Sequence, residues 1–178
     1  MVAAPATPHQ LWSVFTAKAE LVGAAVLRAA SQTAATTLLH EAQAQATHLA
    51  HTASLAERFP DVASQAGARV QRGADVPADV VALGRGAIAE TGSMILDEPD
   101  ADRAACFLAE RLWLLVPCEE IVPTLDDGLQ RLRTLIGQGA RHPQLVTGPS
   151  RTADIERVLT IGVHGPRALM VLVIETHP

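Results

Sequence analysis

The sequence predicts a three-layer α/β domain, in which a mostly parallel sheet carries helices on both faces. Two observations indicate this fold class. Helical patterns alternate with strand-like patterns along the chain, which is typical of α/β folds. Strands buried on both faces of a parallel sheet are continuously apolar. The second half of the chain contains continuous apolar runs of strand length, at residues 80–83, 93–96, 112–116 and 168–174.

The first half is expected to alternate helix and strand as well. Leu11, Phe15 and Val22 recur at helical spacing, and Gly23 ends that pattern. Ser31 or Thr33 can cap the next helix, since a hydroxyl accepts a free backbone N–H at a helix start. The expected elements are, in order, helix 9–22, strand 24–29, helix 33–46, strand 48–52, helix 54–59 (ended by Pro60) and strand 68–71.

The strongest helical pattern covers residues 124–136. Thr124 is the expected N-cap, Asp126 and Asp127 fall in the first turn, and Gly137 follows the last apolar position. Its expected buried stripe consists of Leu125, Leu129, Leu132, Leu135 and Ile136. Neither an internal repeat nor a linker divides the chain. Residues 1–178 are therefore expected to form a single domain, with an N-terminal helix within residues 1–22.

Composition excludes several classes of protein. Hydrophobic residues make up 48% of the chain and charged residues 19%, as in globular domains. The net charge of −5, with 3% aromatic residues, is unlike a nucleic-acid-binding surface. The longest apolar run, residues 168–174, falls well short of the roughly 20 residues that a membrane span needs. The first residues lack the pattern of a signal peptide, so a cytoplasmic location is expected.

No metal or cofactor is expected on this chain. Cys106 and Cys118 are the two cysteines, neither lies in a CxxC, and they cannot supply the four thiolates of an iron–sulfur cluster. We expect them to be free thiols, with Cys106 a small core residue. His48 and His51 are three residues apart on an expected strand, so they point to opposite faces and do not suit a zinc site. Any redox centre should therefore lie on another chain.

The segment TGPSRTADIE, residues 147–156, predicts an anion site. Gly148 permits a tight turn, and Pro149 suits a first helical position or the turn before it. A helix start with free N–H groups beside an arginine binds anions. In the alternative, the polar residues only cap the helix and Arg151 is solvated. The predicted ligand-binding residues here are Thr147, Gly148, Ser150, Arg151, Thr152 and Asp154.

The segment AETGS, residues 89–93, places a carboxylate where the chain enters a strand. Glu90 could act as a base or nucleophile in acyl chemistry, and it is the first predicted catalytic residue. The alternative is that Glu90 only accepts backbone N–H groups at a turn. Thr91 and Gly92 are predicted to contact the same ligand.

The segment GVHGP, residues 162–166, flanks a histidine with glycines just before the last strand. His164 is the second predicted catalytic residue, as a general acid or base or as a carboxylate binder, and Gly165 is predicted to contact the ligand. The alternative is a structural histidine bonded to a turn carbonyl. Ligands of open α/β sheets bind outside the carboxyl ends of the strands, so these loops are expected to converge on one crevice there.

Together with IVPT at residues 121–124, these ordered segments resemble the LUD domain, and specifically the LutC branch of lactate-utilisation proteins. The resemblance covers residues 78–174. It implies a fold similar to the NagB/RpiA/CoA-transferase group. It also implies a role in the oxidation of L-lactate to pyruvate, beside two iron–sulfur partner proteins. The branch lacks the cysteine-rich cluster region of its larger relative.

Three functions are open on this basis. The first is a cytoplasmic, non-cluster subunit of a lactate-oxidising system that binds a small anionic ligand. The second is an acyl- or CoA-transferring enzyme with Glu90 as nucleophile. The third is an assembly or binding module without chemistry of its own.

Overall fold

The computed structural model describes residues 8–45, 48–71, 78–152 and 160–175. The helices are α1 (Pro8–Leu21), α2 (Gln32–Gln45), α3 (Ala53–Arg58), α4 (Pro60–Ser64), α5 (Asp100–Leu108) and α6 (Leu125–Gly137), with a 3₁₀ turn η1 (Cys118–Glu120). The strands are β1 (Ala25–Ala29), β2 (Leu49–His51), β3 (Ala68–Arg69), β4 (Asp79–Ile88), β5 (Ser93–Leu96), β6 (Arg111–Pro117), β7 (Ile121–Val122), β8 (Gln144–Val146), β9 (Arg151–Thr152), β10 (Thr160–Ile161) and β11 (Ala168–Ile174).

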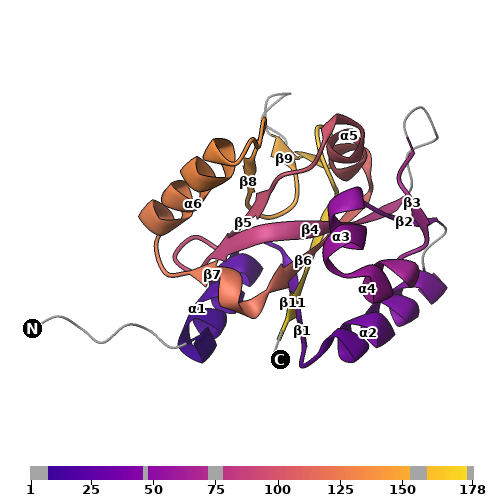
Figure 1. Ribbon diagram of the computed structural model, residues 1–178, viewed down its shortest axis with the longest axis horizontal. Helices are drawn as coiled ribbons and strands as arrows, with labels where there is room; N and C mark the ends of the chain where they lie inside the picture. Colours follow the sequence, from indigo (N-terminus) through magenta and orange to yellow (C-terminus); the bar gives the residue numbers. More distant parts are fainter. Residues whose placement is uncertain (1–7, 46–47, 72–77, 153–159, 176–178) are drawn as a thin grey trace, which may run out of the picture.

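The central sheet is parallel, in the order β1-β11-β6-β4-β2-β3 (Figure 1). Its register is set by the long apolar strands: Leu114 of β6 lies opposite Val171 of β11 on one side and Ala82 of β4 on the other. All three of these residues are fully buried. The continuous apolar runs at 80–83, 112–116 and 168–174 are thus strands of a mostly parallel sheet, as predicted.

Helices cover both faces of this sheet. On β4, Val80 and Ala82 belong to a core cluster that also includes Phe15 of α1 and residues of α5. Their neighbours Val81 and Leu83 belong to a second cluster, with residues of α2, α3 and α4. Successive side chains of a strand point to opposite faces, so the two clusters lie on opposite sides of the sheet. The predicted layering is confirmed.

Strand β4 is longer than predicted and leads into a hairpin. Its second half pairs antiparallel with β5, with an irregular register between Gly84 and Ala87, and β5 pairs antiparallel with β8. The run at residues 93–96 is therefore not a parallel strand. It is nevertheless buried throughout, because this small second sheet covers the central core while α6 packs on β4. Burial on both faces gives a continuous apolar run in either topology.

Helix α6 begins as predicted. The Thr124 hydroxyl accepts the Asp127 N–H, and the Asp127 carboxylate accepts the Thr124 N–H, each at 3.2 Å. The predicted buried stripe is wrong in part, since Leu125 and Leu129 are each 37% exposed and Ile136 is 56% exposed, whereas Leu135 is buried. The helix instead approaches β4 through Gly128, where an added Cβ would overlap the Ile88 side chain.

Two further observations concern the helices. Pro60 ends α3 as predicted, but it also occupies the first turn of α4, a helix that sequence analysis did not predict. Proline suits that position because its missing N–H would have no partner there.

In the described ranges, none of the helices has the length and apolar character to cross a bilayer.

Candidate functional site

A chain of hydroxyl groups joins two of the predicted segments. Thr91 Oγ1 donates to Ser93 Oγ at 2.8 Å, and Ser93 Oγ lies 2.7 Å from Thr147 Oγ1. Ser93 is buried, whereas Thr147 is exposed. Gly92, at φ +68°, makes the turn between β4 and β5, and an added Cβ there would overlap the backbone of Ala19 in α1. The AETGS turn and the end of β8 therefore lie next to each other, beside α1.

The expected helix start at residues 150–152 is wrong. Arg151 and Thr152 form β9, which pairs antiparallel with Thr160–Ile161 of β10. The backbone of Ser150 is also engaged, because its N–H donates to the Pro166 carbonyl at 2.9 Å and its carbonyl accepts the Gly162 N–H at 3.0 Å. Residues 149–152 are therefore not helical, and the described part of this segment offers no helix N-terminus to an anion. Asp154 lies outside the described residues.

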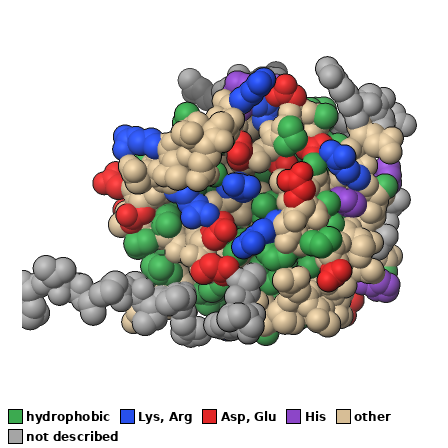
Figure 2. Space-filling view, viewed as in Figure 1, with side chains coloured by type: hydrophobic (Ala, Val, Ile, Leu, Met, Phe, Trp, Pro, Cys, Tyr) green, Lys and Arg blue, Asp and Glu red, His purple; other side chains and the backbone are tan. Residues whose placement is uncertain are grey.

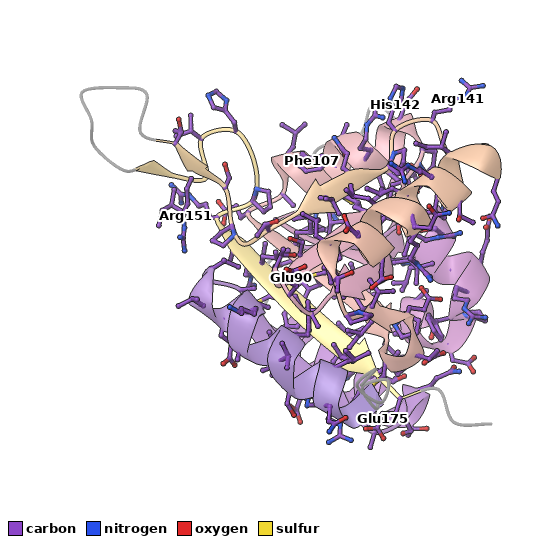
Figure 3. The ribbon with its side chains drawn as sticks, turned by 90° about the vertical axis from the view of Figure 1, so that its left-hand side faces the viewer. Glu90, Phe107, Arg141, His142, Arg151 and Glu175 are labelled. Atoms are coloured by element: carbon purple, nitrogen blue, oxygen red, sulfur yellow. The ribbon has the colours of Figure 1, made fainter. Side chains whose placement is uncertain are left out.

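The predicted tight turn before this strand is present. Gly148 has φ +68° and lies against the Val22 carbonyl at the end of α1. Arg151 is exposed, and its guanidinium fills the space beside Gly23 (Figure 3). A cation near a helix C-terminus is favourable. Arg151 therefore has a structural contact with the end of α1 in addition to its exposure to solvent.

Glu90 is exposed and caps a helix. Its Oε2 accepts the Leu125 N–H at 2.7 Å, at the first residue of α6. A carboxylate is stabilised at a helix N-terminus by the free N–H groups and the helix dipole. The structure thus shows the backbone-accepting role that was the alternative for this residue, while a nucleophilic role stays a prediction.

The GVHGP loop lies at the amino end of the parallel strands. It precedes β11, whose first residue, Ala168, pairs with Arg111, the first residue of β6. The expectation that all loops follow carboxyl ends of strands is therefore wrong for this loop. An added Cβ on Gly165 would lie 3.0 Å from Ser150 Cβ, so this loop does meet the TGPS segment. His164 is exposed.

A buried carboxyl cluster was missed by sequence analysis. Glu98 is 4% exposed, and its Oε1 accepts the Thr52 hydroxyl at 2.7 Å and the Ser54 hydroxyl. Asp102, also buried, accepts the Ala53 N–H at 2.7 Å. These acids come from the DEPD segment and α5, whereas the hydroxyls follow β2. In the sequence, the only local sign of this cluster is that Glu98 follows soon after the apolar run at residues 93–96.

Burial is the main cause of an unusual pKa in this cluster. The pKa of Glu98 is raised to about 7, chiefly by burial and also by the charge of Asp102, while the hydrogen bonds from the Ser54 and Thr52 hydroxyls oppose the shift. Glu98 Oε2 is buried and accepts no hydrogen bond from the part of the chain that the structure describes. Glu98 is therefore poised to gain or lose a proton near neutral pH.

The remaining thiols and histidines do not form a site. Cys106 is fully buried in the core, and burial raises the pKa of its thiol well above the ordinary value, as expected for an unreactive core residue. Both cysteines are free thiols. His51 Nδ1 lies 3.1 Å from the Gly67 carbonyl oxygen. Among the described residues, no three His, Cys, Asp or Glu side chains are grouped as a metal site would need.

Comparison with known proteins places the chain in a family. The sequence model of the LUD domain family matches residues 76–174, more than half of the chain. The chain belongs to the LUD domain family. It is 36% identical over 91 residues to "Lactate utilization protein C" of Bacillus subtilis, a match that covers 48% of this chain and 38% of that protein. The protein of the same name from Deinococcus radiodurans is 40% identical over 90 residues, covering 49% of this chain and 42% of that protein.

These matches span well under half of each relative, so they do not transfer the activity of the whole proteins to this LUD domain chain. A crystal structure of a DUF162 family protein from Deinococcus radiodurans superimposes with a TM-score of 0.67, over 96% of this chain and 99% of that one. At 21% identity this likeness concerns the fold alone. The closer relationship to the NagB/RpiA/CoA-transferase group stays a prediction.

Proposed function

We propose that this LUD domain chain is a LutC-like, non-cluster component of a cytoplasmic system that oxidises L-lactate to pyruvate. The matches to proteins named for lactate utilisation support this role, and the LUD domain match, residues 76–174, includes all four motif segments. Since the chain has two cysteines, both free, the iron–sulfur centres of such a system would belong to partner proteins.

We further propose that the loops beside the end of α1 bind a small anion. The observation that carries this is the convergence of the segments: Thr91, Ser93 and Thr147 are joined by hydroxyl contacts, and Ser150 lies against Gly165. Hydroxyl groups donate to oxyanions, and Arg151 supplies a nearby exposed cation. The proposed ligand contacts therefore do not depend on a helix start. Glu90 and His164 are proposed to border the same ligand.

The acyl- or CoA-transfer alternative has less support. It needs a carboxylate free to attack, whereas one oxygen of Glu90 is held by the Leu125 N–H. A covalent adduct on Glu90 after incubation with an acyl-CoA would favour that alternative over the binding role. The assembly module without chemistry is the outcome if neither anion binding nor an adduct is found.

The proposed partners can be tested by purifying the tagged chain anaerobically from its native cells grown on L-lactate. We expect cysteine-rich iron–sulfur proteins to co-purify, with iron and visible absorption in the eluate. The control is the same purification from cells grown on glucose. An eluate from lactate-grown cells that holds the chain alone, without iron, would contradict the proposed assembly.

The anion site can be tested by titrating inorganic phosphate into the purified protein. Arg151→Ala should weaken phosphate binding at the loops, whereas the matched variant Arg133→Ala should not. Arg133 is an exposed arginine of α6 that donates a 3.5 Å hydrogen bond to the Gln130 side chain. If Arg151→Ala changes only the melting temperature, Arg151 serves the end of α1 and does not bind the anion.

A further inference from the structure

A cavity away from the α1 loops lies where an α/β sheet is expected to bind ligands. It has a volume of about 300 Å³ and is lined by residues that follow or end three adjacent parallel strands: Ser54 after β2, Leu83 and Arg85 on β4, and Glu120 after β6. The connection after β2 runs toward the β3 edge of the sheet, whereas the connection after β4 runs in the opposite direction, toward β6. The crevice between two such strands, called the topological switch point, is the usual ligand position of open α/β sheets.

Arginine side chains dominate this cavity. Arg58, Arg85 and Arg131 line it, against the carboxylates of Glu57 and Glu120. Figure 2 shows basic and acidic side chains gathered in the middle of the face seen in Figure 1, over β4 and between α6 and α3. The cavity therefore carries an excess of positive charge.

The three arginines of this cavity differ in their contacts with other residues. Arg131 donates to Glu120 at 2.5 Å and to the Arg85 carbonyl, and it crosses β4 where Gly86 leaves room. Within the described ranges, the guanidinium of Arg85 makes no hydrogen bond or ion pair, and Arg58 has only a stacking contact, 5.5 Å from the Phe59 ring. Arg85 is half-buried. An unpaired, partly desolvated guanidinium is suited to bind a carboxylate or phosphate through two parallel hydrogen bonds.

The cavity is also connected to the buried acid. Ser54 lines it, and the Ser54 hydroxyl donates to Glu98 Oε1. Glu98 itself borders a larger cavity of about 440 Å³, which Arg141 and His142 also line. A ligand hydroxyl that donates to Ser54 Oγ would thus be linked through one hydrogen bond to Glu98. This is the arrangement that orients a ligand hydroxyl and accepts its proton.

We propose that this arginine cavity is a binding site for a small 2-hydroxycarboxylate, with the carboxylate on Arg85 and the hydroxyl on Ser54. The site is distinct from the loops beside α1. The choice of L-lactate as the ligand to test rests on the proposed role in lactate utilisation, whereas the site itself rests on the geometry of the cavity. The proposal concerns binding and orientation, and it includes no transfer of electrons.

The test is isothermal titration calorimetry of the whole chain with L-lactate, propionate and inorganic phosphate. Propionate has the carboxylate and lacks the hydroxyl. Arg85→Gln should weaken L-lactate binding by at least about tenfold, because it removes a charge-assisted bidentate contact. Ser54→Ala should weaken L-lactate binding several-fold and leave propionate unchanged. Arg133→Gln, which changes an exposed arginine of α6 outside the cavity, should bind L-lactate like the wild type.

Three results would overturn the proposal. They are no L-lactate binding by the wild type, equal L-lactate affinity in Arg85→Gln and the wild type, or phosphate binding that depends on Arg85 without any binding of L-lactate. If Arg85→Gln does not fold, Arg58→Gln on α3 tests the same cavity. Loss of lactate binding in Arg85→Gln together with normal growth of a deletion strain on L-lactate would refute the proposed function alone. Unchanged lactate binding in Arg85→Gln, together with failure of the deletion strain to grow on L-lactate, would refute the cavity site alone.

Discussion

The buried acid Glu98 should make the stability of this protein depend on pH in a way that Glu98→Gln removes. The pKa of Glu98 rises from 4.5 to about 7 in the fold, chiefly through burial. Between these values the folded chain holds a proton that the unfolded chain has released, so the free energy of unfolding falls as pH rises. At 1.36 kcal/mol for each pKa unit, the complete loss is about 3 kcal/mol above pH 7.

Glutamine is a close match for the protonated acid. Its carbonyl can accept the Thr52 and Ser54 hydroxyls, and its amide would occupy the place of Oε2, which has no hydrogen-bond partner among the described residues. We therefore expect the two proteins to be about equally stable at pH 5. At pH 8.5 the variant should be more stable by up to about 3 kcal/mol.

Urea denaturation at half-unit steps from pH 5 to pH 8.5 measures this difference. Contributions that the two proteins share cancel when the two curves are subtracted. The groups around the carboxyl are Asp102 and Cys106 of α5 and, along the adjoining cavity, Asp97, Asp100, Arg141 and His142. Glu41→Gln, at an exposed position of α2, is the control and should follow the wild type. Parallel curves for the wild type and Glu98→Gln would refute the reasoning.

Three further changes should alter stability, as measured by urea denaturation at pH 7. Thr124→Ala should cost about 1 kcal/mol because it removes the N-cap of α6, whereas Thr134→Ala in the same helix should cost less. Arg111→Gln should cost roughly 3 kcal/mol, since it leaves the carboxylate of the 1% exposed Asp79 without its bidentate partner, and a loss below 0.5 kcal/mol would contradict this. Gly92→Ala should cost at least about 1 kcal/mol, because φ is +68° and the new Cβ would meet the backbone of α1; wild-type stability would show that the turn adapts.

Much of the fold follows from apolar periodicity. The repeats in α1 and the continuous runs in β4, β6 and β11 reflect burial, and burial is a property that a sequence records directly. The same signal could not separate a parallel strand from the hairpin strand β5, because the central core and α6 bury the hairpin sheet on both sides. For α6, the apolar stripe was visible, but Gly128 set the face that approaches β4.

The site was harder to predict because its contacts are not local. Ser150, Arg151 and Thr152 have the composition of a helix start, yet pairing with Thr160–Ile161 makes the last two a strand. The contact between Ser54 and Glu98 joins residues 44 positions apart, and no spacing rule connects them. The convergence of Thr91, Ser93 and Thr147, in contrast, followed from two motif segments that the sequence did mark.

The central claim is that this LUD domain chain serves lactate utilisation, and growth on L-lactate tests it most directly. Its gene should be deleted from the native organism, and growth compared on L-lactate and on glucose as the sole carbon source. We predict that the deletion strain fails to grow on L-lactate, grows normally on glucose, and recovers when the wild-type chain or Arg133→Ala is supplied. Growth of the deletion strain on L-lactate at the parental rate would contradict the account.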